Sequence, residues 1–548
     1  MLDSPGSRAP AVRVKAISRI SSRRDILDSG GAADHSMPIH GSDMNMGEPE
    51  QIPKSNIRRK PENGKGEQLM FRQSDALIVV KKQGNSCGAK GRTTMHRDSK
   101  DTASGLRTGT QLTTKLESIT SLVKRNPRIK FTSLAHMLRE DFLMLCFEEL
   151  KRDRVPGIDG ISVETYENGK KERIANLVER LKTNKYKPLP VKRTYIPKAD
   201  GSKRPLGIPT VEDKLVQMGI KKILEAIYEP IFSETSFGFR PNRGCHDALD
   251  KLRVEIMFRP VESIVDMDIR KFFDTVNHSW MIKALKLKIA DSRMLSLITR
   301  MLKSGVMERG EFHETKEGTP QGGVLSPLLA NVYLHYILDM WFGRDIKPKA
   351  RGYCELIRYA DDFVACFANG KDAKEFGAEL NKRLAKYGLS IAEDKSRIIK
   401  FGKRSWHEAL RTKEKLQTFD FLGFTHCCGK SRKGNFSLIQ QTSRKKYAQK
   451  IKDIRQWLRQ EVRKPRELQE GIVKRINQKL SGHYQYYGRC GNYRKISYFY
   501  QKVRKMFYKM LNSRSDRKSY TWVAYEKMLK YNPLILPKIC VKTRNYTS

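Results

Sequence analysis

The sequence predicts an α+β fold, with antiparallel strands in its middle part and helices toward its C-terminal end. Along residues 265–269 apolar and acidic residues alternate, which is the period of a strand with one buried face. Two apolar runs flank the short connection 360–362, and this pattern indicates a β-hairpin. Past residue 444 apolar residues recur at helical spacing, as at Ile472 and Ile476.

The composition points to an anionic partner. The chain has 548 residues, in which 107 Lys and Arg stand against 60 Asp and Glu, a formal net charge of +47. Such a surplus favours nucleic acid, whose phosphates would neutralise it. An anionic membrane is the alternative, but no apolar run approaches the roughly 18 residues of a spanning helix. Nine Cys without a C-x-x-C pair predict neither a disulfide framework nor a zinc module, which agrees with a reducing cytosol.

Residues 1–110 are rich in Ser, Gly, Arg, Lys and Asp, and we expect them to be largely disordered. The basic stretch through Arg23 and Arg24 is compatible with an organellar transit peptide. Acidic residues follow it closely and no apolar signal core is present, so targeting is the less favoured alternative.

The region before the acidic strand predicts helices around a basic β-hairpin. Apolar spacing indicates amphipathic helices within 112–151, at 174–182 and along 211–228. Residues 191–198 and 203–209 are typical of two strands joined by a turn. Their Lys and Arg would hold an incoming triphosphate or, equally well on these residues alone, template phosphates.

Two acidic sites, one on the predicted strand and one at the hairpin tip, suggest a metal centre. Alternation puts Asp266 and Asp268 on one face of the strand and does not decide which of them is a ligand. Asp361 and Asp362 are ordinary for a solvated turn, but apolar strands on both sides would hold them rigidly. Carboxylates from both places could clamp two Mg²⁺ ions for a phosphoryl displacement. Without metal, crowded carboxylates raise one another's pKa.

Three segments give the chain a family resemblance. Residues 359–362, Tyr-Ala-Asp-Asp, resemble the catalytic box of reverse transcriptases, and residues 265–269 resemble their first palm strand. Residues 318–331 look like the nucleotide-side loop and helix of group II intron reverse transcriptases. The motifs occur in the family's order between residues 150 and 490, so the resemblance covers most of the chain.

The resemblance implies a right-hand polymerase with fingers and palm over 111–435, in which an antiparallel palm sheet packs on helices. An α-helical thumb and maturase domain X would follow over 436–515, since residues 476–488 resemble that domain. A basic tail, 516–548, would be a candidate DNA contact. The endonuclease domain that many family members carry is not expected, because its paired Cys and His-rich metal core are missing.

The resemblance also implies site residues. Three carboxylates would be catalytic and, together with Ile269, would bind Mg²⁺: Asp268, Asp361 and Asp362. Asp268 is preferred to Asp266 because it lies five residues before Phe273, where the family places an aromatic ring under the sugar. The residues expected to contact the nucleotide are Lys198, Arg204, Phe273 and Gln321. Those expected to contact template, primer or RNA are Arg240, Arg243, Lys395, Lys479, Tyr484 and Tyr487, and residues 419–424 resemble the strand that grips the primer.

On this resemblance the expected function is that of an RNA-directed DNA polymerase and splicing maturase of a group II intron. It would copy intron RNA into DNA by two-metal phosphoryl transfer during retrohoming. Its partners would be the intron RNA, an RNA template, a DNA primer or target and dNTPs, and no membrane, with a homodimer left open. Between residues 444 and 518, 23 Lys and Arg against 5 Asp and Glu agree with an RNA-binding surface.

Two alternatives remain open at this point. One is a splicing-only, RNA-binding maturase whose polymerase is idle. The other is a bacterial reverse transcriptase of the retron or defence type, without an intron partner. A bacterial cytoplasm is the expected location, ahead of an organellar matrix.

Overall fold

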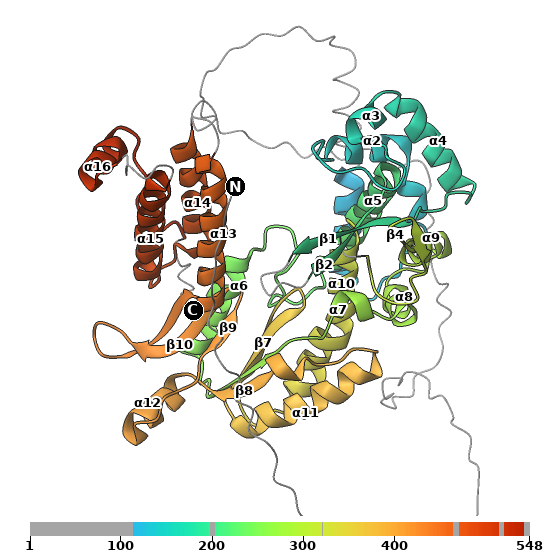
Figure 1. Ribbon diagram of the computed structural model, residues 1–548. Helices are drawn as coiled ribbons and strands as arrows, with labels where there is room; N and C mark the ends of the chain where they lie inside the picture. The colour runs from blue at the N-terminus through green and yellow to red at the C-terminus, as the bar shows by residue number, and fades with distance from the viewer. Residues whose placement is uncertain (1–112, 198–202, 321, 464–470, 514–519, 542–548) are drawn as a thin grey trace, which may run out of the picture. The chain divides into compact units, whose positions relative to one another are not determined.

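The computed structural model describes residues 113–197, 203–320, 322–463, 471–513 and 520–541 (Figure 1). These ranges lie within the larger of the two units into which the chain divides, residues 94–548. The expectation of a largely disordered segment over 1–110 falls outside the described residues.

The part of the chain before the acidic strand is mainly helical. A helix over 113–125 is followed by a 3₁₀ turn and four α-helices: η1 Ala135–Met137, α2 Glu140–Glu148, α3 Val163–Glu167, α4 Lys170–Lys182 and α5 Val211–Tyr228. Side-chain caps begin two of them. Ser162 accepts a hydrogen bond from Thr165 N at 3.1 Å, and Thr210 accepts one from Asp213 N at 3.2 Å. The helix predicted over 211–228 is confirmed.

A four-stranded sheet in the order β2-β1-β4-β5 joins two strands of this part to two that follow the acidic strand in the sequence: β1 Val191–Pro197, β2 Lys203–Ile208, β4 Val306–Glu308 and β5 Glu311–His313. β1 and β2 form the antiparallel hairpin that the sequence predicts, and β1 also pairs in parallel with β4. The β4–β5 hairpin was not predicted, because strands of three residues are too short to show a period.

The central sheet has the order β6-β7-β3-β8 and is antiparallel throughout: β3 Ser263–Met267, β6 Cys354–Tyr359, β7 Asp362–Phe367 and β8 Arg397–Lys400. Alternate residues of its strands face two separate cores. Val265 and Ala365 belong to a core shared with α11 (Gly370–Lys386), whereas Ile264 and Val364 belong to one shared with α6 (Cys245–Phe258) (Figure 1). The predicted acidic strand and hairpin are thus neighbours in one sheet.

Further helices lie between and after these strands in the sequence. They are α7 Phe272–Thr275, α8 His278–Lys286, α9 Ser292–Leu302, α10 Ser326–Leu334, the π-helical segments η2 His335–Asp339 and η3 Phe342–Ile346, the 3₁₀ turn η4 Glu393–Lys395, and α12 Lys403–Thr412.

A smaller sheet in the order β11-β10-β9 follows along the chain: β9 Phe419–Phe421, β10 Phe424–Lys430 and β11 Phe436–Thr442. The single strand expected over 419–424 is wrong, because Leu422 and Gly423 reverse the chain with φ of +48° and +78°. The expected domain boundary between 435 and 436 is also wrong, since it separates β11 from β10, its hydrogen-bonded partner.

Four helices share the last core of the described chain: α13 Arg444–Arg463, α14 Ile472–Tyr487, α15 Tyr493–Asn512 and α16 Trp522–Tyr531. The expectation of a separate tail over 516–548 is corrected, because Tyr525 is fully buried in this core together with Leu480. The Val541 amide also donates a hydrogen bond to Gly488 O at 3.0 Å. None of the described helices combines the length and apolar character needed to cross a lipid bilayer.

Candidate active site

The β3 and β7 strands bring acidic residues to the same end of the central sheet. Met267 is paired with Phe363, and one step further the same register puts Asp268 level with Asp362. Neighbouring strands lie about 4.8 Å apart, so these two residues are adjacent in space although 93 positions lie between them in the sequence.

The β6–β7 hairpin delivers the third carboxylate. Tyr359 pairs with Asp362, which leaves Ala360 and Asp361 as a two-residue turn. Ala360 has φ of +58°, in the left-handed region, so the tip has one defined and unusual backbone conformation. The structure therefore brings the three predicted carboxylates together.

The site crowds negative charge. Burial, followed by the negative charges of Asp361, Asp268 and Asp266, raises the pKa of Asp362 to about 7. Burial also raises the pKa of Asp361, and the charge of Asp268 adds to the effect. The Asp362 side chain still meets solvent, and the neighbouring carboxylates repel one another there. A nearby cation would relieve this repulsion.

Two cationic side chains stand beside the strand carboxylates. Lys395 Nζ lies 3.1 Å from Asp268 Oδ2, and Arg397 Nε lies 3.3 Å from Asp266 Oδ2. Burial raises the pKa of Asp266 to about 6, and Arg397 opposes that rise. Asp266 thus has a partner on β8, whereas Asp268 is the strand carboxylate that is level with the hairpin. This placement agrees with the preference for Asp268 as a metal ligand.

The donor chemistry of the site suits a hard divalent cation. Carboxylate oxygens are the ligands that Mg²⁺ takes from proteins, and the ammonium of Lys395 already supplies positive charge at Asp268. Within the described ranges, no group of three His, Cys, Asp or Glu side chains is arranged so that it could hold a metal ion as it stands. The side chain of Ile269 is a hydrocarbon without a donor atom, so only its backbone carbonyl could serve as the ligand that the resemblance implies.

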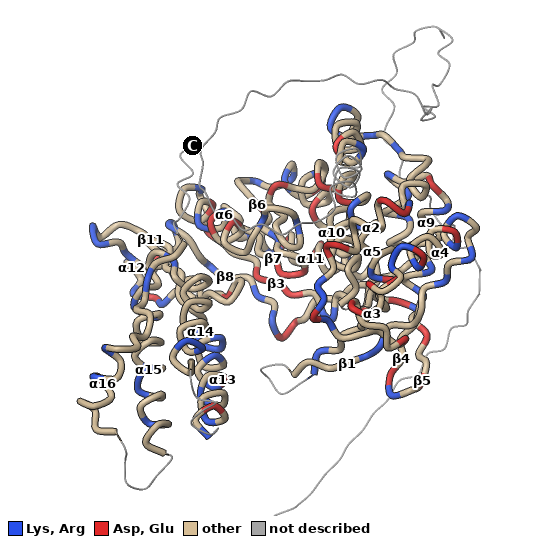
Figure 2. The backbone as a smooth tube through the Cα atoms, turned by 90° about the horizontal axis from the view of Figure 1, so that it is seen from above, with Lys and Arg blue, Asp and Glu red and all other residues tan. Residues whose placement is uncertain are grey.

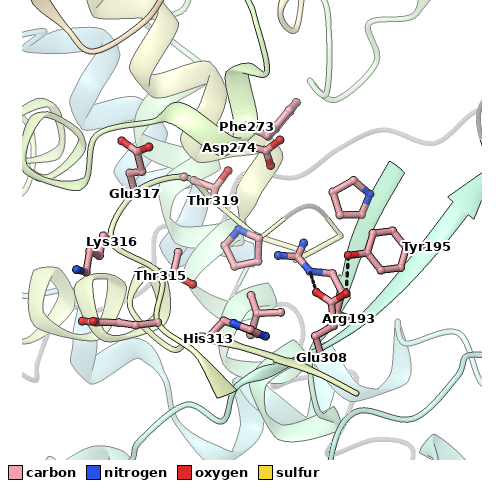
Figure 3. Close-up of a pocket in the computed structure, with 15 residues that line it drawn as sticks. Arg193, Tyr195, Phe273, Asp274, Glu308, His313, Thr315, Lys316, Glu317 and Thr319 are labelled. Carbon is pink, nitrogen blue, oxygen red and sulfur yellow. Dashed lines mark hydrogen bonds and ion pairs between the residues drawn. The ribbon is translucent and has the colours of Figure 1, made fainter. Parts of the chain in front are cut away.

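A cavity of about 550 Å³ borders Phe273 (Figure 3). Phe272 is 2 % exposed and belongs to the core, whereas Phe273 lines the cavity. Elsewhere in the wall, Tyr195 donates a hydrogen bond to Glu308 Oε1 at 2.6 Å, and Arg193 Nε lies 3.9 Å from Oε2 of the same carboxylate. Sequence reasoning missed Tyr195 and Glu308, because they come from β1 and β4 and nothing in either strand signals the other.

Gly322 lies directly against β2. A Cβ at Gly322 would stand 2.6 Å from Leu206 Cδ1 and 2.7 Å from Gly207 O, so glycine is required for this close approach. The loop that carries the sequence motif is therefore held beside the basic hairpin.

The expected nucleotide contacts are described only in part. Arg204 is exposed on β2, and its positive charge opposes the rise that burial causes in the pKa of Asp361. Arg204 is thus close enough to Asp361 to act on that carboxylate electrostatically. Lys198 and Gln321 lie outside the described residues.

A second cavity, of about 460 Å³, borders Asp362. Lys445 and Lys446, at the start of α13, contribute positive charge to its wall, and Tyr486 and Tyr487 contribute aromatic rings from the end of α14. Tyr487 was expected at RNA or primer. The two lysines were missed, because the surrounding sequence is so basic that no single pair stands out.

Two residues expected to contact template, primer or RNA are buried instead. Arg240 is 7 % exposed, and its guanidinium lies 2.8 Å from the carboxylate of Glu229. Tyr484 is 0 % exposed, and its hydroxyl donates a hydrogen bond to Ile535 O at 3.2 Å. Both expectations are corrected, because side chains with so little exposed surface cannot reach a nucleic acid backbone.

The remaining four residues of that group are at least partly exposed: Arg243, Lys395, Lys479 and Tyr487. The Arg243 guanidinium lies 5.7 Å from the centre of the Phe237 ring, and Lys479 Nζ lies 4.6 Å from that of Trp457. Such contacts orient the cationic groups and leave their other faces open.

Positive charge recurs along the C-terminal helices, as Figure 2 shows for α13, α14 and α15. On α13, Lys452, Arg455 and Arg459 are exposed, while Ile454 and Leu458 are buried. The helix therefore packs through its apolar stripe and presents cations to solvent. A surface of this kind suits the phosphate backbone of a nucleic acid.

Comparisons with known proteins bear on these observations. Residues 196–426 match the family described as reverse transcriptase (RNA-dependent DNA polymerase). The chain is 41% identical over 248 residues to the group II intron-encoded protein LtrA of Lactococcus lactis subsp. cremoris, a match that covers 43% of this chain and 41% of LtrA. It is 34% identical over 245 residues to protein YkfC of Escherichia coli K12, covering 39% of this chain and 64% of YkfC.

A third relative extends the comparison to eukaryotes. Over 155 residues the chain is 31% identical to nuclear intron maturase 4, mitochondrial, of Arabidopsis thaliana, covering 28% of this chain and 19% of that protein. In each of these three cases the chain spans less than two thirds of the relative's length.

Proposed function

We propose that this chain is a group II intron-encoded reverse transcriptase, which copies RNA into DNA and promotes the splicing of an intron RNA. In the polymerase reaction the 3′-hydroxyl oxygen of a primer attacks the α-phosphorus of a dNTP, and pyrophosphate leaves. During retrohoming the template would be the intron RNA itself.

The convergence of Asp268, Asp361 and Asp362 at one end of the central sheet is the observation that carries the polymerase proposal. All three lie within residues 196–426, the part that matches the family. Phosphoryl transfer requires charge stabilisation and positioning more than covalent chemistry by the protein. Rigid carboxylates next to cationic side chains supply both.

Reverse transcriptase domains generally use a divalent metal ion, usually Mg²⁺. Asp268 and Asp361 would hold it, with Asp362 and the Ile269 carbonyl completing the donor set. Two ions held there would supply positive charge to stabilise the attacking and leaving oxygens. The chain's own contribution is to hold these oxygen donors together and to place the positive charges of Lys395 and Arg204 beside them.

The two cavities support a division of substrates. Phe273, at the wall of the larger cavity, would lie under the deoxyribose and exclude a ribose 2′-hydroxyl. Arg204 would contact the triphosphate. The smaller cavity, with Lys445 and Lys446 next to Asp362, would receive the primer terminus.

The maturase proposal is supported by the basic surface of the C-terminal helices and by the intron-related names of the relatives. Structured RNA is recognised largely by shape and backbone, which exposed cations on packed helices can contact. We place the intron RNA on this surface.

Primer extension on an RNA template tests the polymerase proposal. Asp361→Ala should lower dNTP incorporation at least about a hundredfold, because it removes a carboxylate that would hold the metal ion on which stabilisation of the transition state depends. Binding of structured RNA should remain unchanged. As a matched control, Asp345→Ala removes an exposed carboxylate on η3 and should leave both activities unchanged.

The alternatives predict different results. A wild-type chain that binds RNA tightly but incorporates no dNTP under any divalent metal condition would be a splicing-only maturase. A chain that incorporates dNTPs but co-purifies with no intron RNA would belong with the retron or defence enzymes. Sequencing the RNA that co-purifies with the chain separates the proposed intron-encoded enzyme from the retron or defence enzymes.

A further inference from the structure

Arg358, the next-to-last residue of β6, is a charged side chain in the interior of the protein. Its side chain is 1 % exposed. Its guanidinium grips Asp339 with two hydrogen bonds, Nε to Oδ1 at 2.7 Å and Nη2 to Oδ2 at 2.5 Å. The carboxylate is itself only 3 % exposed. A buried charge pair of this kind is costly to desolvate and is weak evidence for stability alone.

The third nitrogen of the guanidinium turns toward the hairpin tip. Arg358 Nη1 donates to the backbone oxygen of Ala360 at 2.9 Å and to Asn331 Oδ1 at 2.9 Å. Asn331 in turn donates to Gly238 O at 2.6 Å. A Cβ at Gly238 would collide with the backbone N of Ala360. The tip is therefore clamped from one side by the guanidinium and from the other by a closely packed backbone.

Ala360 needs such a clamp. Its φ of +58° puts it in the left-handed region, which is unfavourable for a residue with a Cβ. It is the first residue of a two-residue turn, where a positive φ favours glycine. The second residue of that turn is Asp361, and Asp362 follows at the start of β7. Any relaxation at Ala360 would therefore re-aim both carboxylates.

Asn331 and Asp339 lie on one continuous helix, and a π-helical segment in it lets both side chains reach the Arg358 guanidinium. In a regular α-helix, residues eight apart point about 80° away from each other around the axis. Here the segment His335–Asp339 is π-helical, with a hydrogen bond from Met340 N to His335 O, and widened turns rotate less per residue. This change brings the two side chains onto one face, where both reach Arg358.

We propose that Arg358, held by Asp339 and Asn331, is a positioning residue that sets the direction of Asp361 and Asp362 by fixing the carbonyl of Ala360. It contacts neither substrate nor metal. This inference rests on the proposed polymerase role of the two carboxylates. It also gives the buried ion pair a role beyond stability.

Three variants separate positioning from mere stability. Arg358→Lys keeps the positive charge but loses the planar guanidinium that donates to Asp339, Asn331 and Ala360 at once. Arg358→Met leaves the Asp339 carboxylate buried without its partner. The double variant Arg358→Met, Asp339→Leu replaces the pair with apolar groups, which often preserves stability. Arg383→Met is the matched control, because Arg383 donates to Ile337 O of the same π-helical segment at 2.9 Å but makes no contact with the turn.

Hydrogen exchange of the hairpin peptide gives a readout that needs no activity. In the double variant we expect amide exchange at 359–363 to be at least about tenfold faster, with other core amides and the thermal midpoint close to wild type. In primer extension, kcat should fall at least about tenfold and KM for dNTP should stay within about twofold, because the carboxylates are misaimed but the nucleotide contacts remain. Arg358→Lys should lie between wild type and the double variant.

Two results would overturn the inference. One is a folded double variant whose exchange at the hairpin tip matches that of wild type and of Arg383→Met. The other is a tip that exchanges faster while kcat is unchanged. A wild-type chain without any dNTP incorporation would refute the polymerase proposal instead, and the hydrogen-exchange comparison would still decide whether Arg358 holds the tip.

Discussion

Phe272 and Phe273 have the same side chain, but their successive positions on α7 point one ring into the core and the other toward the larger cavity. Phe272 is buried against Tyr333, with ring centres 6.5 Å apart, and Phe273 lines the cavity. The function we propose for Phe273 therefore depends on the direction of its ring rather than on its chemistry. The same applies to Arg240 and Tyr484, whose residue types suit nucleic acid but whose positions are internal.

Removing the Phe273 ring should weaken sugar discrimination. For Phe273→Ala we expect incorporation of ribonucleotides, relative to deoxyribonucleotides, to rise at least about tenfold, because the clash with the 2′-hydroxyl is lost. Competition between labelled rNTP and dNTP in primer extension measures this ratio. Phe258→Ala, at a ring that is 72 % exposed, is the control and should leave the ratio unchanged. An unchanged ratio for Phe273→Ala would remove this residue from the nucleotide site.

His483 provides a pH-dependent contribution to stability. Its ring stacks on Phe499 at a centre-to-centre distance of 3.7 Å, and neither ring nitrogen has a partner among the described residues. Burial, with the positive charge of Lys450 adding to it, lowers its pKa from 6.5 to about 4. The unfolded chain therefore takes up the proton first as the pH falls. Stability from the neutral ring is complete above the unfolded pKa and is lost between about pH 6.5 and pH 4.

By pH 5 this loss should amount to about 2 kcal/mol. Urea unfolding near pH 7 and near pH 5 measures it. His483→Phe keeps the stacking and removes the titrating group, so its unfolding free energy should depend less on pH by that amount. His407→Phe, at an exposed histidine, should retain the wild-type dependence. Equal slopes for wild type and His483→Phe would contradict the assignment.

At the scale of elements, the C-terminal helices are joined to the central region through the segment between α14 and α15. Arg489, 2 % exposed, pairs with Asp250 of α6, which is 4 % exposed. Asn492 accepts a hydrogen bond from Thr442 N at 3.0 Å, at the end of β11. These contacts lie next to the rings of Tyr486 and Tyr487, which line the smaller cavity. The segment between α14 and α15 therefore holds the C-terminal helices against the central region and also adjoins the proposed primer site.

Breaking this pair should destabilise the protein strongly. Arg489→Met leaves Asp250 buried and uncompensated, and we expect a loss of about 3–5 kcal/mol in the free energy of unfolding. Adding Asp250→Leu should recover most of that loss, because no lone charge remains. Denaturant unfolding of both variants gives the comparison. Arg494→Met, at an exposed arginine of α15, should change stability by no more than about 0.5 kcal/mol.

At the scale of the whole molecule, the net charge of +47 dominates the expected behaviour toward RNA. Binding to structured RNA should weaken at least about a thousandfold between 50 and 200 mM salt, because each phosphate contact releases a condensed counterion. Neutralising Lys452, Arg455 and Arg459 of α13 to Gln should make the salt slope shallower by about one unit for each residue that contacts phosphate. Filter binding over a salt series measures the slope.

The control for this experiment removes the same amount of positive charge from a different helix. Lys371, Lys374 and Lys382 are exposed on α11, and their replacement by Gln changes the net charge by the same amount. This triple variant should keep the wild-type slope if the RNA lies on the C-terminal helices. Equal reductions in both triple variants would mean that binding follows the total charge and not the surface we propose.

The sequence by itself determined the α+β class, the helix over 211–228, the basic hairpin, and the pairing of an acidic strand with an Asp-Asp hairpin. These features depend on local periodicity and turn chemistry, which a linear chain carries in full. Only the tertiary structure decided that Arg240 and Tyr484 are core residues, that Arg358 donates a hydrogen bond to Ala360 O in the β6–β7 turn, and that Lys445 and Lys446 line the same cavity as Asp362. Those outcomes depend on contacts between segments far apart in the sequence. A local pattern does not show whether a distant segment will bury a charged or aromatic side chain.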